Sequence, residues 1–106
     1  MSFSTTVFQI LDALDVDGLE NLCHEEFIFV DDYEMLNRDD WIERIQALWS
    51  ENPIDFSCER NVIADQRDIF CMQYSLDIDG VSYRITNVSL LKDGKFWRSQ
   101  IHRVPI

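Results

Sequence analysis

The sequence predicts an α+β fold in which three helices come first and a curved antiparallel β-sheet follows. Apolar residues recur at helical spacing in the first fifty residues, and the period changes to two from Ile54 onward. Asp-Gly pairs at 79–80 and 93–94 mark tight turns between successive strands. The chain has 106 residues, and 46% of them are apolar. We therefore expect a single domain over residues 1–106 with a core of its own.

Three helices are predicted in the first half of the chain. The first covers about residues 3–14, and a short second helix follows Asp15 or Asp17 as its N-cap. The third begins near Arg38, after Asn37 as a plausible N-cap, and ends before Pro53. The residues expected on the buried helix faces are Phe3, Val7, Ile10, Leu11 and Leu14, then Val16, Leu19, Leu22 and Cys23, then Trp41, Ile45, Leu48 and Trp49.

Five strands are predicted. The unbroken apolar run Phe27–Val30 indicates a short buried strand between the second and third helices. The alternating pattern then predicts strands over about residues 54–64, where Arg60 interrupts the pattern, and over about 68–78, 81–91 and 95–104. Ile54, Phe56, Cys58, Val62 and Ala64 mark the first strand of this series.

The Asp79-Gly80 turn fixes the register of the first hairpin. A two-residue loop pairs Ile78 with Val81, and further along the two strands it pairs Met72 with Asn87. The face that we expect to be buried then carries Phe70, Met72, Tyr74, Leu76, Tyr83, Ile85 and Leu91.

The second turn allows two registers. A two-residue loop at Asp93-Gly94 would bury Arg98, Gln100 and His102, whereas a three-residue loop over residues 92–94 would bury Trp97, Ser99, Ile101 and Arg103. Burying a large apolar side chain gains roughly 2 kcal/mol, and burying an unpaired Arg costs several. We therefore predict the three-residue loop, with His102 on the outer face at a possible dimer contact.

A polar strip is expected on the buried face. Asn87 and Ser99 should face each other near the middle of the sheet, because that register pairs their strands at these positions. Such a strip within an apolar face is typical of a ligand cavity. The strip consists of Tyr74, Tyr83, Asn87, Ser89, Ser99 and Arg103.

Charge and cysteine content exclude several classes of function. The net charge of −11 disfavours nucleic acid and anionic membranes as partners. No run of about 18 apolar residues occurs. Three cysteines without CxxC spacing, and two histidines far apart in sequence, indicate neither a disulfide framework nor a metal site. We expect a cytoplasmic protein that needs no metal or other cofactor, with no signal peptide.

The order of elements, the turn motif Leu91–Phe96 and the segment Leu19–Phe27 together resemble the nuclear transport factor 2-like superfamily, which includes SnoaL-like polyketide cyclases and ketosteroid isomerases. The resemblance spans nearly the whole chain. It implies a cone-shaped sheet wrapped around three N-terminal helices, with a pocket between the sheet and the first and third helices. It also implies a homodimer through the outer sheet face.

The same resemblance implies roles for individual residues. The isomerases place a general base just after the first strand, where this chain has Asp31 and Asp32, and a hydrogen-bond donor close to the position of Asn87. Their Tyr on the first helix is missing here, which weakens the isomerase chemistry.

The residues allow both structural and functional interpretations of each candidate. Asp31 or Asp32 either ends a strand in solvent or points into the pocket as a base, and adjacent residues of an extended segment point opposite ways, so at most one does so. Glu34 could do the same from the loop. Asp39 and Asp40 are fully explained as first-turn residues of a helix.

Four further candidates are left open. His24 either satisfies a helix end or lies at the pocket rim, and Arg103 pairs with an internal acid, binds a ligand carboxylate or reaches solvent. Trp49 and Trp97 belong either to the core or to the pocket lining.

Three functions remain in competition. The first is a pocket that binds a small hydrophobic or mixed polar and apolar ligand. The second is an isomerase-, cyclase- or hydratase-type enzyme, with Asp31 or Asp32 as base and Asn87, Tyr83 or Tyr74 as hydrogen-bond donors. The third is a protein-interaction module that uses the outer sheet face. The sequence leaves open whether the protein is an enzyme, and we favour the first function.

Overall fold

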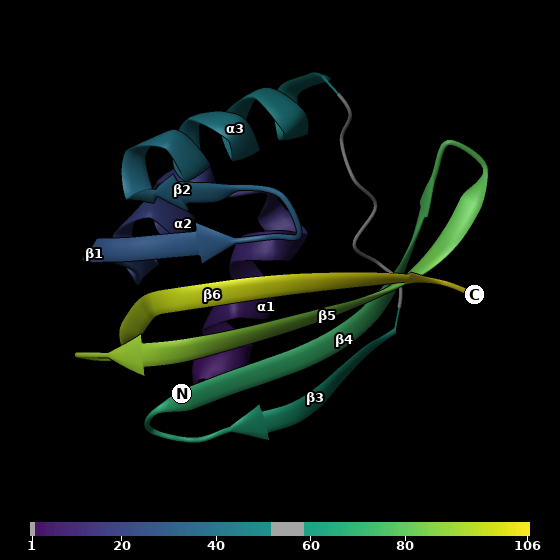
Figure 1. The fold of residues 1–106 in the computed structure, drawn as a ribbon. Coiled ribbons are helices and arrows are strands. Elements are labelled where there is room, and N and C mark those ends of the chain that lie inside the picture. Colours follow the sequence, from purple (N-terminus) through teal and green to yellow (C-terminus); the bar gives the residue numbers. More distant parts are fainter. Residues whose placement is uncertain (1, 52–58) are drawn as a thin grey trace.

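Three helices cover one face of a six-stranded, strongly curved sheet (Figure 1). The computed structural model describes residues 2–51 and 59–106. Its helices are α1 (Phe3–Ala13), α2 (Val16–Leu22) and α3 (Arg38–Glu51). Its strands are β1 (Cys23–Val30), β2 (Met35–Asn37), β3 (Arg60–Asp65), β4 (Ile69–Ile78), β5 (Val81–Lys92) and β6 (Lys95–Pro105). The predicted α+β class is confirmed.

The sheet is mixed but mostly antiparallel. Its strand order is β2-β1-β6-β5-β4-β3, and only the pairing of β1 with β6 is parallel. This parallel contact joins the strand that lies among the helices to the last strand of the chain. It therefore brings the end of β1, with Asp31 just after it, beside the far half of β6.

Side-chain caps begin each helix. Ser2 Oγ accepts a hydrogen bond from the backbone N–H of Thr5, and the Asp15 carboxylate accepts one from Gly18. Asn37 Oδ1 accepts from the backbone N–H of Asp40 at 2.9 Å. Each cap satisfies an N–H group that has no partner within the helix, which explains where the helices start. The Asn37 cap is confirmed, and of the two acids considered for α2 it is Asp15 that serves.

Several predicted boundaries are wrong. Cys23, expected at the end of the second helix, starts a strand of eight residues instead of the four predicted. Strand β2 was not predicted, and it pairs with β1 at Val30 and Met35. Arg60, expected to interrupt a strand, is the first residue of β3. The expectations for Pro53, Ile54, Phe56 and Cys58 fall outside the described residues.

The first hairpin has the predicted register. Ile78 pairs with Val81 and Met72 with Asn87 across the Asp79-Gly80 turn. Asp79 and Gly80 both have positive φ angles, 52° and 80°, as the tight two-residue turn requires.

The second hairpin turns the expected β6 residues inward beyond its first turn, but its pairing differs from the predicted one by two residues. Its loop has two residues, because Lys92 pairs with Lys95, so the predicted three-residue loop is wrong. A β-bulge then shifts the register: Leu91 pairs with Phe96 and Leu90 with Arg98, which leaves Trp97 as the extra residue. Beyond the bulge, Ser99, Ile101 and Arg103 face inward as expected. Phe96, and not Trp97, fills the core.

The core lies between the helices and the concave face of the sheet. Phe27 and Phe70 are almost fully buried, and Phe3 of α1 packs edge-on against Phe70 and Phe96 at centroid distances of 5.2 and 5.0 Å. These edge-on ring contacts hold α1 against β4 and β6. Among the described residues, no helix is both long and apolar enough to cross a membrane.

Candidate functional site

A cavity of about 1140 Å³ lies between the concave face of the sheet and the three helices. This volume lies slightly above the range of roughly 300–1,000 Å³ that is typical of small-molecule sites, so the cavity has room for a ligand of drug size. Most of its wall is apolar, so the cavity can remove an apolar ligand from water. The apolar lining includes Val7, Leu11, Leu19, Phe29, Trp41, Ile45, Trp49, Met72, Ile85, Phe96 and Ile101.

Polar side chains from neighbouring strands line one part of this wall. Asn87 of β5, Ser99 of β6 and Tyr74 of β4 all face the cavity. Asn87 does not lie directly opposite Ser99 as expected, because the bulge pairs Asn87 with Ile101 and Ser89 with Ser99. The two polar residues are instead diagonal neighbours that a third side chain connects.

Ser89 makes that connection. It is completely buried, and its Oγ donates a hydrogen bond to Asn87 Oδ1 at 2.9 Å and lies 2.8 Å from Ser99 Oγ. A buried hydroxyl with both of its neighbours in hydrogen-bond range holds them in fixed positions. The sequence placed Ser89 in the polar strip but assigned it no role. The sequence did contain a signal for this contact, because Asn87 and Ser89 are two residues apart on one strand and therefore share a face.

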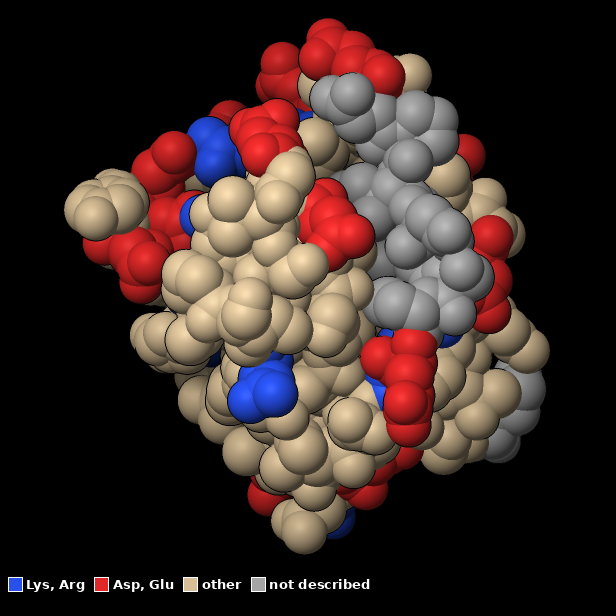
Figure 2. Space-filling model, turned by 90° about the vertical axis from the view of Figure 1, so that its right-hand side faces the viewer, with Lys and Arg blue, Asp and Glu red and all other residues tan. Residues whose placement is uncertain are grey.

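Charged residues gather at the wide end of the cavity. Arg103 Nη2 lies 4.0 Å from Asp31 Oδ2, and Arg44 of α3 forms an ion pair with Glu34. All four residues contribute to the cavity lining. Figure 2 views the molecule from this end, and acidic side chains clearly outnumber basic ones there. Two arginines, each beside a carboxylate, are therefore the positive groups that a ligand meets at the entrance.

Asp31 reaches the cavity, and Asp32 is exposed. The Oδ1 atom of Asp31 accepts the backbone N–H groups of Tyr33 and Glu34, each at 3.0 Å. These bonds close the loop between β1 and β2 and occupy one carboxylate oxygen. Only Oδ2, on the side of Arg103, remains to meet a ligand.

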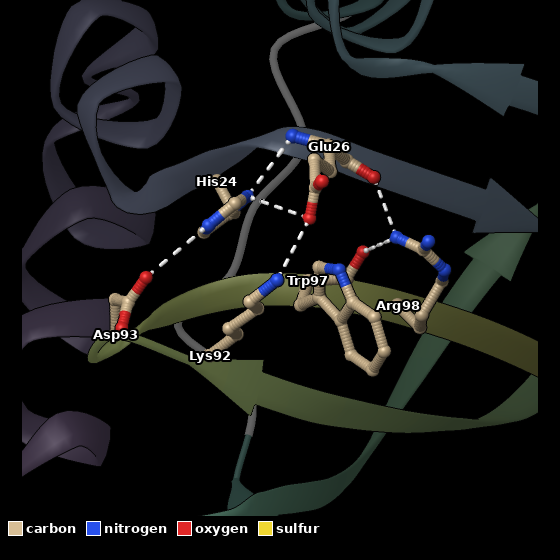
Figure 3. A network of polar contacts seen from close by, with 6 residues as sticks. All are labelled: His24, Glu26, Lys92, Asp93, Trp97 and Arg98. Atoms are coloured by element: carbon tan, nitrogen blue, oxygen red, sulfur yellow. Dashed lines mark hydrogen bonds and ion pairs between the residues drawn. The ribbon is translucent and has the colours of Figure 1, made fainter.

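His24 and Trp97, both expected near the pocket, lie at the opposite end of the molecule (Figure 3). His24 Nδ1 accepts the backbone N–H of Glu26 at 3.0 Å, and its Nε2 lies 3.4 Å from Asp93 Oδ2. The Trp97 ring lies under Arg98, whose guanidinium carbon is 4.2 Å from the ring centroid. Both residues connect β1 with the β5–β6 hairpin. Trp97 does so because the bulge turns its ring out of the cavity.

Glu26 is the centre of this group. Lys92 Nζ donates to its Oε1 at 2.9 Å, and this bond and the charge of Lys92 hold the pKa of the Glu26 carboxyl below its ordinary value, although desolvation acts in the opposite direction. The buried indole N–H of Trp97 points toward the same carboxylate and also lowers its pKa, although it does not reach full hydrogen-bond geometry.

Of the remaining predicted site residues, Trp49 lines the cavity and Tyr83 does not. Trp49 is buried in the core and also lines the cavity. Tyr83 shares the face of Ile85 and Asn87 by alternation, but it lies further along β5, opposite Pro105, and is half-buried outside the lining. Arg44 and Glu34 complete the entrance. The sequence held a signal for Arg44, because it lies three residues after Trp41 and four before Leu48. This helical spacing places it on the same side of α3 as the predicted buried residues.

The described residues offer little for metal or thiol chemistry. Within the ranges 2–51 and 59–106, no three His, Cys, Asp or Glu side chains lie close enough together to hold a metal ion. Burial raises the pKa of the Cys23 thiol to about 12, and burial also raises the pKa of Cys71. Both thiols therefore stay protonated and are poor nucleophiles near neutral pH.

Solved structures with the same fold are numerous, although the sequence alone finds no relatives. No family model matches the chain, and neither does any curated protein. A candidate ketosteroid isomerase from Kribbella flavida superposes with a TM-score of 0.73 at 15% identity, covering 96% of this chain and 75% of that one. A candidate polyketide cyclase from Sinorhizobium meliloti gives a TM-score of 0.71 at 16% identity, covering 94% and 93%. A nuclear transport factor 2-like protein of unknown function from Burkholderia xenovorans gives 0.70 at 18%, covering 95% and 79%. Such low identities establish the fold and leave the activity open.

Proposed function

We propose that this chain, which has the nuclear transport factor 2-like fold, binds a small molecule in the cavity between its sheet and its helices. The ligand has a largely apolar body and at least one hydrogen-bonding group. The observation that carries this proposal is the cavity of about 1140 Å³, whose apolar wall includes the inward-facing side chains of Asn87, Ser99 and Tyr74. Polar groups in a mainly apolar cavity orient a ligand at little cost, because the ligand replaces their water.

A pair of tryptophan substitutions on adjacent residues tests this proposal. Ile101 lines the cavity, whereas the next residue, Gln100, is exposed on the outer face. The probe is Prodan, a neutral naphthalene ketone whose emission shifts to the blue in apolar surroundings. We expect saturable binding to the wild type, a loss of tenfold or more in affinity for Ile101→Trp, and little change for Gln100→Trp.

Thermal melts of both variants give the control for folding. Unsaturable binding, or equal losses in both folded variants, would place the probe somewhere other than the cavity and count against the proposal.

An enzyme that transfers a proton is the second candidate. It is favoured by one observation: Asp31, and not Asp32, lines the cavity, with Oδ2 turned toward Arg103. Against this, two backbone N–H groups already bind Oδ1, so only Oδ2 is left to take a proton from a ligand. The candidate ketosteroid isomerase and polyketide cyclases among the structural neighbours support this class of reaction only by analogy.

Asparagine substitutions separate the two acids. Asp31→Asn keeps an oxygen for the loop and removes the base, so it should lower proton exchange of a cyclic ketone such as 2-tetralone in D₂O by at least about 100-fold. Asp32→Asn should leave the rate unchanged. Equal rates in both variants and the wild type would remove Asp31 from the chemistry.

We also propose that two copies of the chain associate through the outer sheet face. Leu90 and Val104 are about half exposed on this face, at 46% and 56%, and Gln100 and His102 lie beside them. Sedimentation should give a dimer for the wild type and a monomer for Leu90→Asp. A monomeric wild type at 100 μM would refute this assembly.

The other expected properties remain part of the proposal. The net charge of −11 supports partners other than nucleic acid and anionic membranes. The free, buried thiols of Cys23 and Cys71 support a cytoplasmic location. Ligand binding of this kind needs no cofactor.

A further inference from the structure

The hydrogen bonds among Asn87, Ser89 and Ser99 have a fixed direction. Ser89 has a single hydroxyl proton, and it donates this proton to the carbonyl oxygen of Asn87, which cannot donate in return. The 2.8 Å contact between the two serine hydroxyls also needs a proton. Ser99 must therefore be the donor, and the chain runs from Ser99 through Ser89 to Asn87.

This direction decides what the two outer residues present to a ligand. Because the Asn87 oxygen is occupied by Ser89, its NH₂ group is left to donate. Among the residues that the structure describes, nothing accepts a hydrogen bond from this nitrogen. Ser99 has used its proton, so its oxygen presents a lone pair. Both residues line the cavity, and they are diagonal neighbours on adjacent strands.

We propose that Ser89 is a positioning residue that turns Asn87 and Ser99 into a donor–acceptor pair for a neutral ligand with a carbonyl next to an N–H or O–H group. Lactams, hydroxyketones and enols have this arrangement. The carbonyl accepts from Asn87 Nδ2, and the neighbouring N–H or O–H donates to Ser99 Oγ. The inference rests on the proposed function, and it narrows the ligand to one chemical class.

The surroundings favour a neutral group at this position. Ile85, Met72 and Ile101 line the cavity around Asn87, and the two arginines lie at the wide end. A carboxylate or ammonium group beside Asn87 would lose hydration against these apolar side chains, whereas an amide or hydroxyketone needs only the two hydrogen bonds.

Three bicyclic probes of similar size test the pair. 2-Quinolone has the carbonyl and the adjacent N–H, N-methyl-2-quinolone has only the carbonyl, and naphthalene has neither. Calorimetry on the wild type should show 2-quinolone binding about tenfold more tightly than its N-methyl derivative, since one hydrogen bond is lost. In Ser89→Ala this ratio should fall below about twofold, and the affinity for naphthalene should be unchanged.

The Ser89→Ala variant also shows whether N-methyl-2-quinolone binds weakly only because its methyl group is too large for the cavity. If the ratio stays near tenfold in Ser89→Ala, the methyl group clashes with the wall and Ser89 positions nothing, which overturns the inference. A wild-type ratio near one, with naphthalene bound, overturns the inference and leaves the proposed pocket intact. Binding of none of the three probes, together with no binding of Prodan, rejects both.

A measurement without ligand reports on the same residue. The side-chain NH₂ of Asn87 in ¹⁵N-labelled wild type should be rigid, with an order parameter near that of the backbone, about 0.85, and it should fall below about 0.6 in Ser89→Ala. The Ser89→Cys variant, which is slightly larger and keeps a weak donor, should lie between the two. An Asn87 amide that is equally mobile in all three folded proteins would contradict a positioning role for Ser89.

Discussion

Asp31 and Asp32 are adjacent and chemically alike, yet the fold separates them. The alternation of an extended segment predicts that at most one of them can face the pocket. Which one does so depends on where β1 ends and on the turn that follows, and the Asp31 bonds to Tyr33 and Glu34 settle this. Sequence alone could therefore name the pair but not choose between its members.

Glu26 gives a pH prediction at the same scale. Its pKa in the folded protein lies below its ordinary value, chiefly because Lys92 donates a hydrogen bond to it. A carboxyl with a lowered folded-state pKa stabilises the protein above its unfolded-state pKa of about 4.3, and this contribution is lost as the pH falls through the lower, folded-state value. Glu26→Gln should therefore be less stable than the wild type near pH 6, and the difference should shrink as the pH falls below about 4.

Glu25→Gln is the matched control, since it removes the same charge from the neighbouring exposed position. Urea unfolding at a series of pH values measures the difference, and 0.5 M NaCl should reduce it because Glu26 is exposed. A difference between wild type and Glu26→Gln that does not change with pH would show that the Lys92 contact has no energetic weight.

At the scale of elements, most of the β6 strand faces as predicted, although both its turn and its pairing with β5 differ from the prediction. The burial argument predicted that Trp97 and Ile101 face inward, and the structure agrees for Ile101 but not for Trp97. The sequence offered a longer loop as the means, whereas the chain uses a two-residue turn followed by a bulge at Trp97. A bulge has no simple sequence signal, so the exchange of Phe96 for Trp97 in the core could not be foreseen.

Alanine substitutions at these two positions test the bulge. Phe96 is 6% exposed and packs against Phe3 and Phe70, so Phe96→Ala should lower the free energy of unfolding by about 3 kcal/mol or more. Trp97→Ala removes a ring that lies mainly against Arg98 and Lys92, and should cost less than about 2 kcal/mol. Urea titrations rank the two variants, and a larger loss for Trp97→Ala would place this residue in the core instead.

Strands β1 and β2 mark another limit of prediction. The apolar run Phe27–Val30 identified the second half of β1, but Cys23 and His24 looked like the end of a helix. They become strand residues because β1 pairs in parallel with β6, and Cys23 lies beside Phe96. A contact between residues so far apart in the chain leaves no local signal, and so His24 was placed at the wrong end of the molecule.

At the scale of the whole molecule, the order of elements predicted the fold class and the side of the sheet on which the cavity lies. Hairpin register then identified Tyr74, Asn87, Ser99 and Arg103, all of which line the cavity. The volume of the cavity, the pairing of Arg44 with Glu34 and the link through Ser89 depend on how strands and helices pack, and they required coordinates.

The central claim is that the concave face of the sheet holds a small molecule. A ¹⁵N NMR titration with 2-quinolone tests it most directly, because it reports on every strand at once. The account predicts saturable shifts at Asn87, Ser99 and Ile101, with Gln100 and His102 on the outer face unchanged. Shifts confined to the outer face, or none at millimolar 2-quinolone, would contradict it.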